Sequence, residues 1–229
     1  MEATEIVCLA NSRKLNGRCV AGLRTDGRGW VRPVSDRLDG ALLPHEYRLN
    51  DGSETGVLDI VKLNLLTRCP RPHQPENWLT NSWRLVRRPA SKDIIPLLRS
   101  NLVNGPELLG NTFDRVPAAS FSSTPAPSSL ALVEPKNLQL YITLNVRNRK
   151  QPRAIFELSR VRYNLAITDP FWEERLGVLS TGLYQPTAIG LQPHDKILLT
   201  ISLGEPFEGY CYKLVAAIIV LPQSWRRFW

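Results

Sequence analysis

The sequence has few of the residues from which metal centres and disulfide-rich scaffolds are built. Its 229 residues include only four cysteines and three histidines. No two cysteines have the CxxC spacing of a zinc site, and the histidines are too scattered to form an HxxxH or HxE motif. We therefore expect reduced thiols, no metal site and no cofactor.

Long apolar runs are also missing. The longest, residues 214–221, has the length of a buried strand and falls well short of the roughly 20 apolar residues that span a bilayer. The N-terminal MEATEIVCLAN does not have the basic and then apolar pattern of a signal peptide. There is no GxxxxGK[ST] loop of the kind that holds ATP phosphates. We expect a cytoplasmic protein with no membrane partner.

Positive charge is in surplus. Lysine and arginine total 29 against 21 acidic residues, which gives a formal net charge of +8. A surplus of this size favours polyanionic partners, although it does not determine the fold.

The surplus is densest near the N-terminus, where residues 11–33 read NSRKLNGRCVAGLRTDGRGWVRP. This stretch contains a single acid, Asp26. Cations beside an aromatic ring suit a surface that contacts phosphates and stacks a base. Alternatively, the tryptophan closes a barrel and the arginines are simply solvated. The candidate nucleic-acid contacts here are Arg13, Lys14, Arg18, Arg24, Arg28, Trp30 and Arg32.

Three other clusters combine cations with turns or aromatic residues. Residues 68–92 carry six cations around Trp78 and Trp83. A predicted hairpin tip carries four more, of which Arg149 and Lys150 are further candidate contacts. The tail, residues 225–229, reads WRRFW and is too apolar to be left exposed. For each cluster a solvated or packing role is the alternative.

Hydrophobic periodicity indicates strands in both halves of the chain. Residues 138–147 alternate apolar and polar side chains, and Asn-Gly and Asp-Gly pairs near the N-terminus suit hairpin turns. Short helices are expected at residues 92–101, after Ser91, and at 169–176, where Pro170 follows Asp169. Lys213 opens an apolar strand, and its ammonium is expected to reach outward.

Residues 118–129, rich in serine, proline and alanine, read as a linker. The predicted fold class is mostly β: two tandem small antiparallel OB-like barrels with a few short helices. The predicted organisation is a first barrel with an inserted loop and helix at 1–117, the linker, a second barrel at 130–222 and an aromatic, basic tail at 223–229. The strand count by itself also allows one sandwich.

Four segments carry a resemblance that covers residues 8–219: CLANSRKLNGRCVAGLRTDGRGWVRPVS, GNTFDRVP, YNLAITDP and SLGEPFEGYCYKLVAAII. They resemble the prokaryotic dual OB-fold domain. The resemblance implies two OB-like barrels in tandem and a nucleic-acid-binding role, sometimes in defence-type gene neighbourhoods. None of the segments is a catalytic signature, so no active site is implied.

The leading hypothesis is therefore binding of single-stranded or structured nucleic acid through phosphate contacts and aromatic stacking. Two alternatives stay open. One is a metal-dependent enzyme acting on a nucleotide or nucleic acid, with Asp114, Asp169 or Glu205 as ligands, although Asp169 better fits a helix N-cap. The other is an interaction module whose tail, residues 224–229, docks a partner protein.

Overall fold

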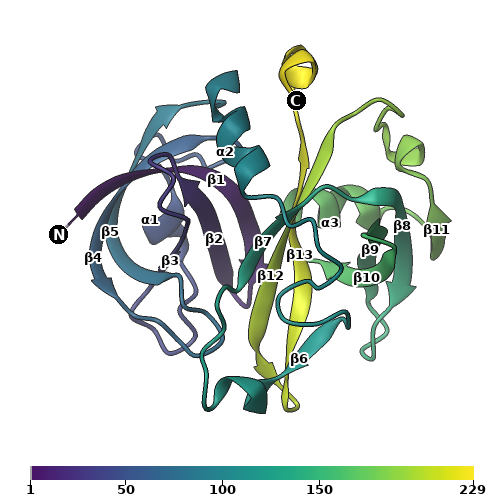
Figure 1. The fold of residues 1–229 in the computed structure, drawn as a ribbon, viewed down its shortest axis with the longest axis horizontal. Helices are drawn as coiled ribbons and strands as arrows, with labels where there is room; N and C mark the ends of the chain where they lie inside the picture. Colours follow the sequence, from purple (N-terminus) through teal and green to yellow (C-terminus); the bar gives the residue numbers. More distant parts are fainter. Residues whose placement is uncertain (1) are drawn as a thin grey trace.

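The computed structural model describes residues 2–229 and shows two β-barrels side by side (Figure 1). Strands dominate, and the helices are short. The two-barrel architecture predicted from the sequence is confirmed. No helix among residues 2–229 is long and apolar enough to cross a membrane.

The first barrel is closed, with strand order β1-β2-β3-β5-β4. β1 is long enough to pair with β4 through its first half and with β2 through its second, while β3 pairs with β5 in parallel. Buried side chains such as Ile6, Val20 and Leu63 fill the interior. The strands are β1 (Glu2–Lys14), β2 (Gly17–Arg24), β3 (Trp30–Val34), β4 (Ile60–Arg68) and β5 (Asn77–Arg87).

The second barrel repeats this pairing with its first strand broken in two. β7 pairs with β12 and β8 pairs with β9, and only Glu134 and Pro135 separate β7 from β8. A proline interrupts a ladder because it has no N–H to donate. β10 pairs in parallel with β13, as β3 does with β5. The strands are β7 (Leu130–Val133), β8 (Lys136–Leu144), β9 (Lys150–Leu158), β10 (Val161–Ile167), β12 (Ile197–Phe207) and β13 (Tyr210–Val220), with β11 (Gly182–Tyr184) beside β8 and β6 (Arg115–Pro117) beside β13.

The predicted helices are present. α3 (Pro170–Gly177) begins after Asp169, whose carboxylate accepts hydrogen bonds from the backbone N–H groups of Phe171 and Trp172. The helix expected after Ser91 consists of η1 (Lys92–Ile94) followed by α2 (Ile95–Ser100), and Ser91 accepts from the Asp93 N–H. The remaining helical turns are α1 (Pro44–Tyr47), η2 (Ala118–Phe121), η3 (Pro186–Ile189) and η4 (Gln223–Phe228).

The alternating stretch at 138–147 forms β8, with Leu138, Leu140 and Ile142 buried in the second core. The strand ends earlier than predicted, at Leu144, and Val146 is fully exposed. The reason lies in the turn, because the Asn145 side chain accepts hydrogen bonds from the backbone N–H groups of residues 147 and 149 and closes the hairpin there.

A third apolar cluster joins the two barrels. It combines Leu9 and Leu23 of the first barrel with Leu132 and Ala217 of the second, and α2 adds Leu98. Hydrogen bonds cross the same boundary: the Thr200 hydroxyl donates to the Leu9 carbonyl at 2.6 Å. The barrels therefore share a continuous buried interface.

The predicted linker, residues 118–129, runs beside this interface. β6, which precedes it, already pairs with β13 of the second sheet. The linker itself holds η2 and a loop, in which the hydroxyl groups of Ser128 and Ser129 donate to the carboxylate of Glu76 in the first barrel. The division of the chain into folding units at 118–129 stays a prediction.

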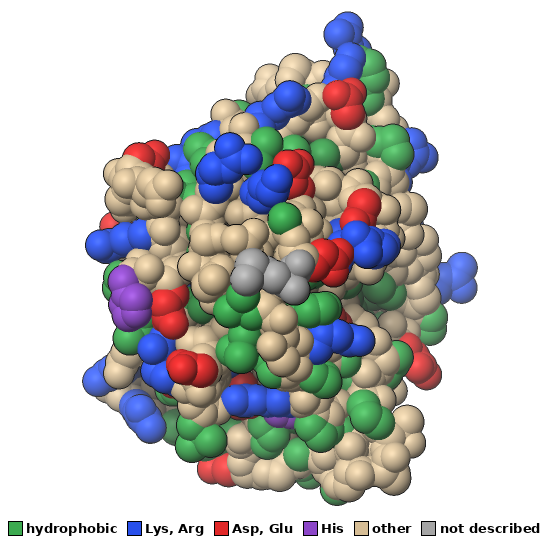
Figure 2. Space-filling model, turned by 90° about the vertical axis from the view of Figure 1, so that its left-hand side faces the viewer, with side chains coloured by type: hydrophobic (Ala, Val, Ile, Leu, Met, Phe, Trp, Pro, Cys, Tyr) green, Lys and Arg blue, Asp and Glu red, His purple; other side chains and the backbone are tan. Residues whose placement is uncertain are grey.

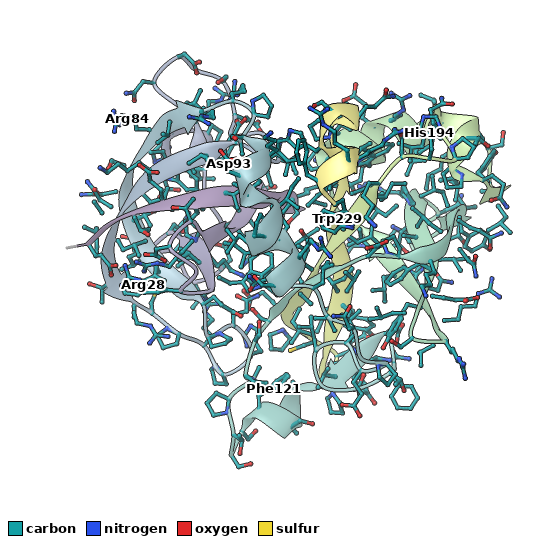
Figure 3. All side chains as sticks on the ribbon, turned by 45° about the horizontal axis from the view of Figure 1, so that its top comes forward. Arg28, Arg84, Asp93, Phe121, His194 and Trp229 are labelled. Carbon is teal, nitrogen blue, oxygen red and sulfur yellow. The ribbon has the colours of Figure 1, made fainter. Side chains whose placement is uncertain are left out.

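The C-terminal tail is packed against its own chain. Trp225 is buried in the cluster between the barrels. The Lys196 ammonium lies 4.9 Å from the ring centroid of Trp229, the last residue of the tail (Figure 3 labels Trp229). Phe228 receives the Lys92 ammonium at 3.9 Å. A tail that docks a partner would have to give up these contacts.

Candidate nucleic-acid interface

Most cations of the N-terminal stretch have a carboxylate partner. Arg18 forms two hydrogen bonds with Glu54, at 3.1 and 3.2 Å. Arg24 and Arg28 share Glu2 and Asp26, and the two arginines hold the pKa of Asp26 well below its usual range. Figure 2, which views the left side of Figure 1, shows blue side chains beside red ones over much of that face.

Arg13 and Lys14 point from the end of β1 to the second barrel. Arg13 contacts Glu173 of α3 at 2.8 Å, and Lys14 contacts Glu205 of β12 at 2.7 Å. These two ion pairs bridge the barrels, so the positive charges serve a contact within the molecule.

Trp30 and Arg32 turn inward. Trp30 is half-buried against the cluster between the barrels. Arg32 is 0% exposed, and its Nη2 donates to the hydroxyls of Ser129 and Ser202. The seven candidate residues of this stretch therefore do not form one open basic wall, because five of them pair with carboxylates and Trp30 and Arg32 turn inward.

The two candidates at the β8–β9 hairpin differ from each other. Arg149 is exposed at the tip, and the structure gives its guanidinium no carboxylate partner among residues 2–229. Lys150 donates instead to the carbonyl oxygens of Gly177 and Leu179 at the end of α3. Arg149 is free for a ligand, whereas Lys150 stabilises a helix end.

The three candidate metal ligands do not converge. Asp169 caps α3, and burial raises its pKa to about 6 despite hydrogen bonds from three backbone N–H groups. Glu205 is bound by cations, and Asp114 pairs with Arg115. Across residues 2–229 no group of three or more His, Cys, Asp or Glu side chains is placed to hold a metal ion.

A groove on the second barrel has a different character. It has a volume of about 620 Å³ and runs over β8, β9 and β10 between the hairpin loops β8–β9 and β12–β13. β8, β9 and β10 correspond to strands 1, 2 and 3 of an OB fold, and the β8–β9 and β12–β13 loops correspond to its loops L12 and L45. OB folds bind oligonucleotides with strands 2 and 3 and with these two loops.

Aromatic side chains line one end of the groove. Phe207 is 62% exposed, and its ring centroid lies 6.5 Å from that of Tyr212. Tyr210 follows at 6.4 Å from Tyr212, and the Arg115 guanidinium lies 5.0 and 5.4 Å from the Tyr210 and Tyr212 rings. Rings presented at a surface with an arginine between them offer flat faces on which bases stack.

The charge in the groove is positive. Arg153 on β9 donates to Asn164 and has no carboxylate partner among the described residues, while Asp114 is the one acidic residue in the lining.

Lys213 also lines the groove, but its ammonium is held by Asn111 and Phe113, and burial lowers its pKa to about 8. The expectation that it reaches outward was wrong, because backbone carbonyls of the 111–113 loop enclose it.

Sequence reasoning missed most of this groove. The alternation at residues 138–147 places Tyr141 on the polar face of β8, and Arg153 is one of the four cations of the basic hairpin. Phe207 and Tyr212 gave no signal, because they approach β8–β10 only once β13 pairs with β10.

A second groove, of about 720 Å³, lies on the first barrel between α1, β4 and β5. It is lined by amide and hydroxyl side chains and by Arg48, Lys62 and Arg84 (Figure 3 labels Arg84). Trp83 in its lining is buried, and the one exposed ring there is the imidazole of His45, so this groove offers less aromatic surface for stacking than the groove of the second barrel.

A family model described as the dual OB-containing domain matches residues 4–218. The chain belongs to this family. No curated protein matches the sequence. Membership of this family agrees with the two barrels of the fold.

Two solved structures show a distant likeness. One is a murine DNA binding protein bound with double-stranded DNA, at 8% identity over 96% of this chain and 99% of that chain, with a TM-score of 0.32. The other is the tetrameric p202 HIN2, at 5% identity over 96% and 92%, with a TM-score of 0.29. Likeness at this level carries no argument about the ligand.

Proposed function

We propose that this dual OB protein binds single-stranded nucleic acid in the groove of its second barrel. The observation that carries the proposal is that, on the OB ligand face, the exposed ring of Phe207 and the half-buried ring of Tyr212 lie in one groove with Arg153, which has no carboxylate partner among the described residues. Phe207 and Tyr212 stack bases, while Arg153 and Arg149 contact phosphates. The bases must be unpaired, because rings in the groove reach only bases that are free of a duplex.

Other cations identified from the sequence have a smaller part in this proposal. Arg13, Lys14, Arg18, Arg24 and Arg28 would have to give up their carboxylates to bind phosphate. Lys150 and Arg32 are held by other groups of the chain. We therefore assign the main contacts to the second barrel.

The test is a binding panel of labelled single-stranded DNA, single-stranded RNA and duplex DNA, measured by fluorescence anisotropy. Wild type is expected to prefer the single strands. Phe207→Ala is expected to weaken single-strand binding by about 1–3 kcal/mol, roughly 5- to 150-fold, since one stacking partner is lost.

The matched control is Arg87→Gln, which removes an exposed cation at the end of β5 on the first barrel. It is to be compared with Arg153→Gln, which makes the same change in charge inside the groove. Equal weakening by the two arginine variants would mean that net charge, and not the groove, drives binding.

A further inference from the structure

A small pocket lies between the barrels, and we propose that it binds a phosphomonoester on Arg32. The pocket is lined by residues of β1, β2 and β3 on one side and of β12 and β13 on the other. This goes beyond the proposed function, because the site would exist even if no oligonucleotide bound the groove.

Arg32 is the first reason. Its side chain is fully buried, and although Nη2 donates to two serine hydroxyls, Nε and Nη1 have no acceptor within the protein. Burying a guanidinium whose N–H groups have no acceptor costs folding free energy. A ligand that supplies the missing acceptor therefore stabilises the folded chain. Arg32 is one of the residues that line the pocket.

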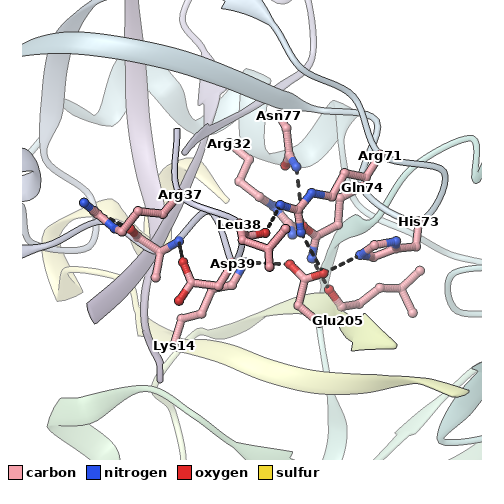
Figure 4. Close-up of polar contacts among 12 residues, drawn as sticks. Lys14, Arg32, Arg37, Leu38, Asp39, Arg71, His73, Gln74, Asn77 and Glu205 are labelled. Atoms are coloured by element: carbon pink, nitrogen blue, oxygen red, sulfur yellow. Dashed lines mark hydrogen bonds and ion pairs between the residues drawn. The ribbon is translucent and has the colours of Figure 1, made fainter. Parts of the chain in front are cut away.

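The second reason is the local charge. Glu205 is the only acid in the pocket lining, and it faces Lys14 at 2.7 Å, Arg71 at 3.0 Å and His73 at 2.9 Å (Figure 4). Burial alone would raise the pKa of Glu205, but the hydrogen bonds from His73 and Lys14 and the charge of Arg71 outweigh it and lower the pKa to about 2.

Lys14, Arg71 and Arg32 therefore give three permanent cations in or beside the pocket against the one carboxylate of Glu205, while Arg13, which also lines the pocket, is paired with Glu173. The excess of two positive charges matches a phosphomonoester, which carries about −1.5 to −2 at neutral pH. A phosphodiester or a carboxylate carries one negative charge and would leave part of this positive charge without a counter-charge.

The size and the lining of the pocket further limit which phosphomonoesters can bind in it. Its volume of about 270 Å³ admits a phosphate with a small organic body, but not a folded nucleic acid. Ser12, Thr168 and Ser202 supply hydroxyls, and Leu15 and Leu203 supply an apolar wall. Leu214 lines both this pocket and the groove of the second barrel, so the two sites are neighbours.

Isothermal titration calorimetry tests the site with inorganic phosphate, a nucleoside 5′-monophosphate, and one oligonucleotide carrying either a 5′-phosphate or a 5′-hydroxyl. Two variants remove it in different ways. Arg32→Met removes the donors, and Cys19→Phe fills the pocket while keeping every charge. Arg87→Gln is the control, because that residue lies outside the pocket lining.

We expect saturable binding of at least one phosphomonoester by wild type and by Arg87→Gln, and at least about tenfold weaker binding by both pocket variants. Binding of the free nucleotide or inorganic phosphate identifies a small-molecule ligand. Tighter binding of the 5′-phosphorylated oligonucleotide alone identifies a strand end. If Arg32→Met fails to fold, Cys19→Phe decides.

The proposal is overturned if no phosphomonoester binds saturably, or if Cys19→Phe binds as well as wild type. Failure of the groove proposal is separate: it shows as loss of all binding to the 5′-hydroxyl oligonucleotide, with binding of phosphate esters retained.

Discussion

Individual arginines in this protein differ chiefly in whether a carboxylate lies within reach. Arg18 finds Glu54, and Arg13 finds Glu173, each far away along the chain. Arg149 and Arg153 have no such partner among residues 2–229. Because an arginine in an ion pair must lose its carboxylate before it binds phosphate, Arg149 and Arg153 of the second barrel are the better candidates for phosphate contacts, although Arg153 also donates to Asn164.

Asp169 is a buried carboxylate that stabilises the fold by accepting hydrogen bonds from backbone N–H groups. Replacement by alanine removes the cap of α3 and leaves the Ile218 N–H without its acceptor, so we expect a loss of about 1–3 kcal/mol in unfolding free energy. Urea unfolding of Asp169→Ala measures it.

The loss should depend on pH in a defined direction. Burial raises the pKa of Asp169 from 3.8 to about 6, so protonation adds stability that is fully present below 3.8 and lost as pH rises through 6. The difference between wild type and Asp169→Ala should therefore be larger at pH 4 than at pH 7.5. A larger difference at the higher pH would contradict this role of the carboxyl group.

Elements from the two barrels meet through a few contacts, and the effect of removing each contact on stability can be measured. Glu205 of β12 receives Lys14 of β1 together with Arg71 and His73 of the β4–β5 loop (Figure 4). Thr200 and Trp225 add a hydrogen bond and apolar contact across the same boundary. The elements at the interface therefore hold the barrels as one unit.

Glu205→Gln should destabilise this interface. The pKa of Glu205 lies at about 2 in the folded chain against 4.5 as its ordinary value, so its contribution is present above pH 4.5 and is lost as pH falls towards 2. Since the side chain is one-third exposed, we expect a loss of about 1–2 kcal/mol at pH 7. Chemical denaturation at pH 7 and pH 3 should show a smaller difference at pH 3, and a constant difference would contradict the ionic origin.

Trp225→Ala tests whether η4 belongs to the core between the barrels. Trp225 is 7% exposed, and truncating a buried tryptophan costs about 3–5 kcal/mol. We expect a single thermal unfolding transition at a lower temperature, measured by circular dichroism. An unchanged transition would show that the tail contributes nothing to the interface.

Local patterns in the sequence were sufficient for many elements. Period-two alternation located β8, and the Asp169-Pro170 pair located the start of α3. The early end of β8 was not predictable, because it depends on how the Asn145 side chain folds back on the turn. The sequence also could not show which cations lack an acidic partner. Glu54, which pairs with Arg18, lies in another segment of the chain, so a count of acids near Arg18 does not find it.

The whole molecule is two OB barrels fused through a buried interface, with one aromatic, basic groove on the second barrel and a small cationic pocket between them. The family relationship made the two barrels predictable. The position of the groove was not predictable, because its lining joins β8, β9 and β10 to the β12–β13 hairpin, which is far from them in the sequence.

The most direct test of the groove is the salt dependence of single-strand binding. Each phosphate contact adds roughly 0.7 to the slope of log affinity against log salt concentration. Between about 50 and about 200 mM salt, wild type should show a steep slope, and Arg149→Gln with Arg153→Gln together should reduce it by roughly 1.4, two contacts' worth, whereas Arg87→Gln leaves it unchanged. A flat wild-type slope, or the same slope in all three proteins, would contradict binding in this groove.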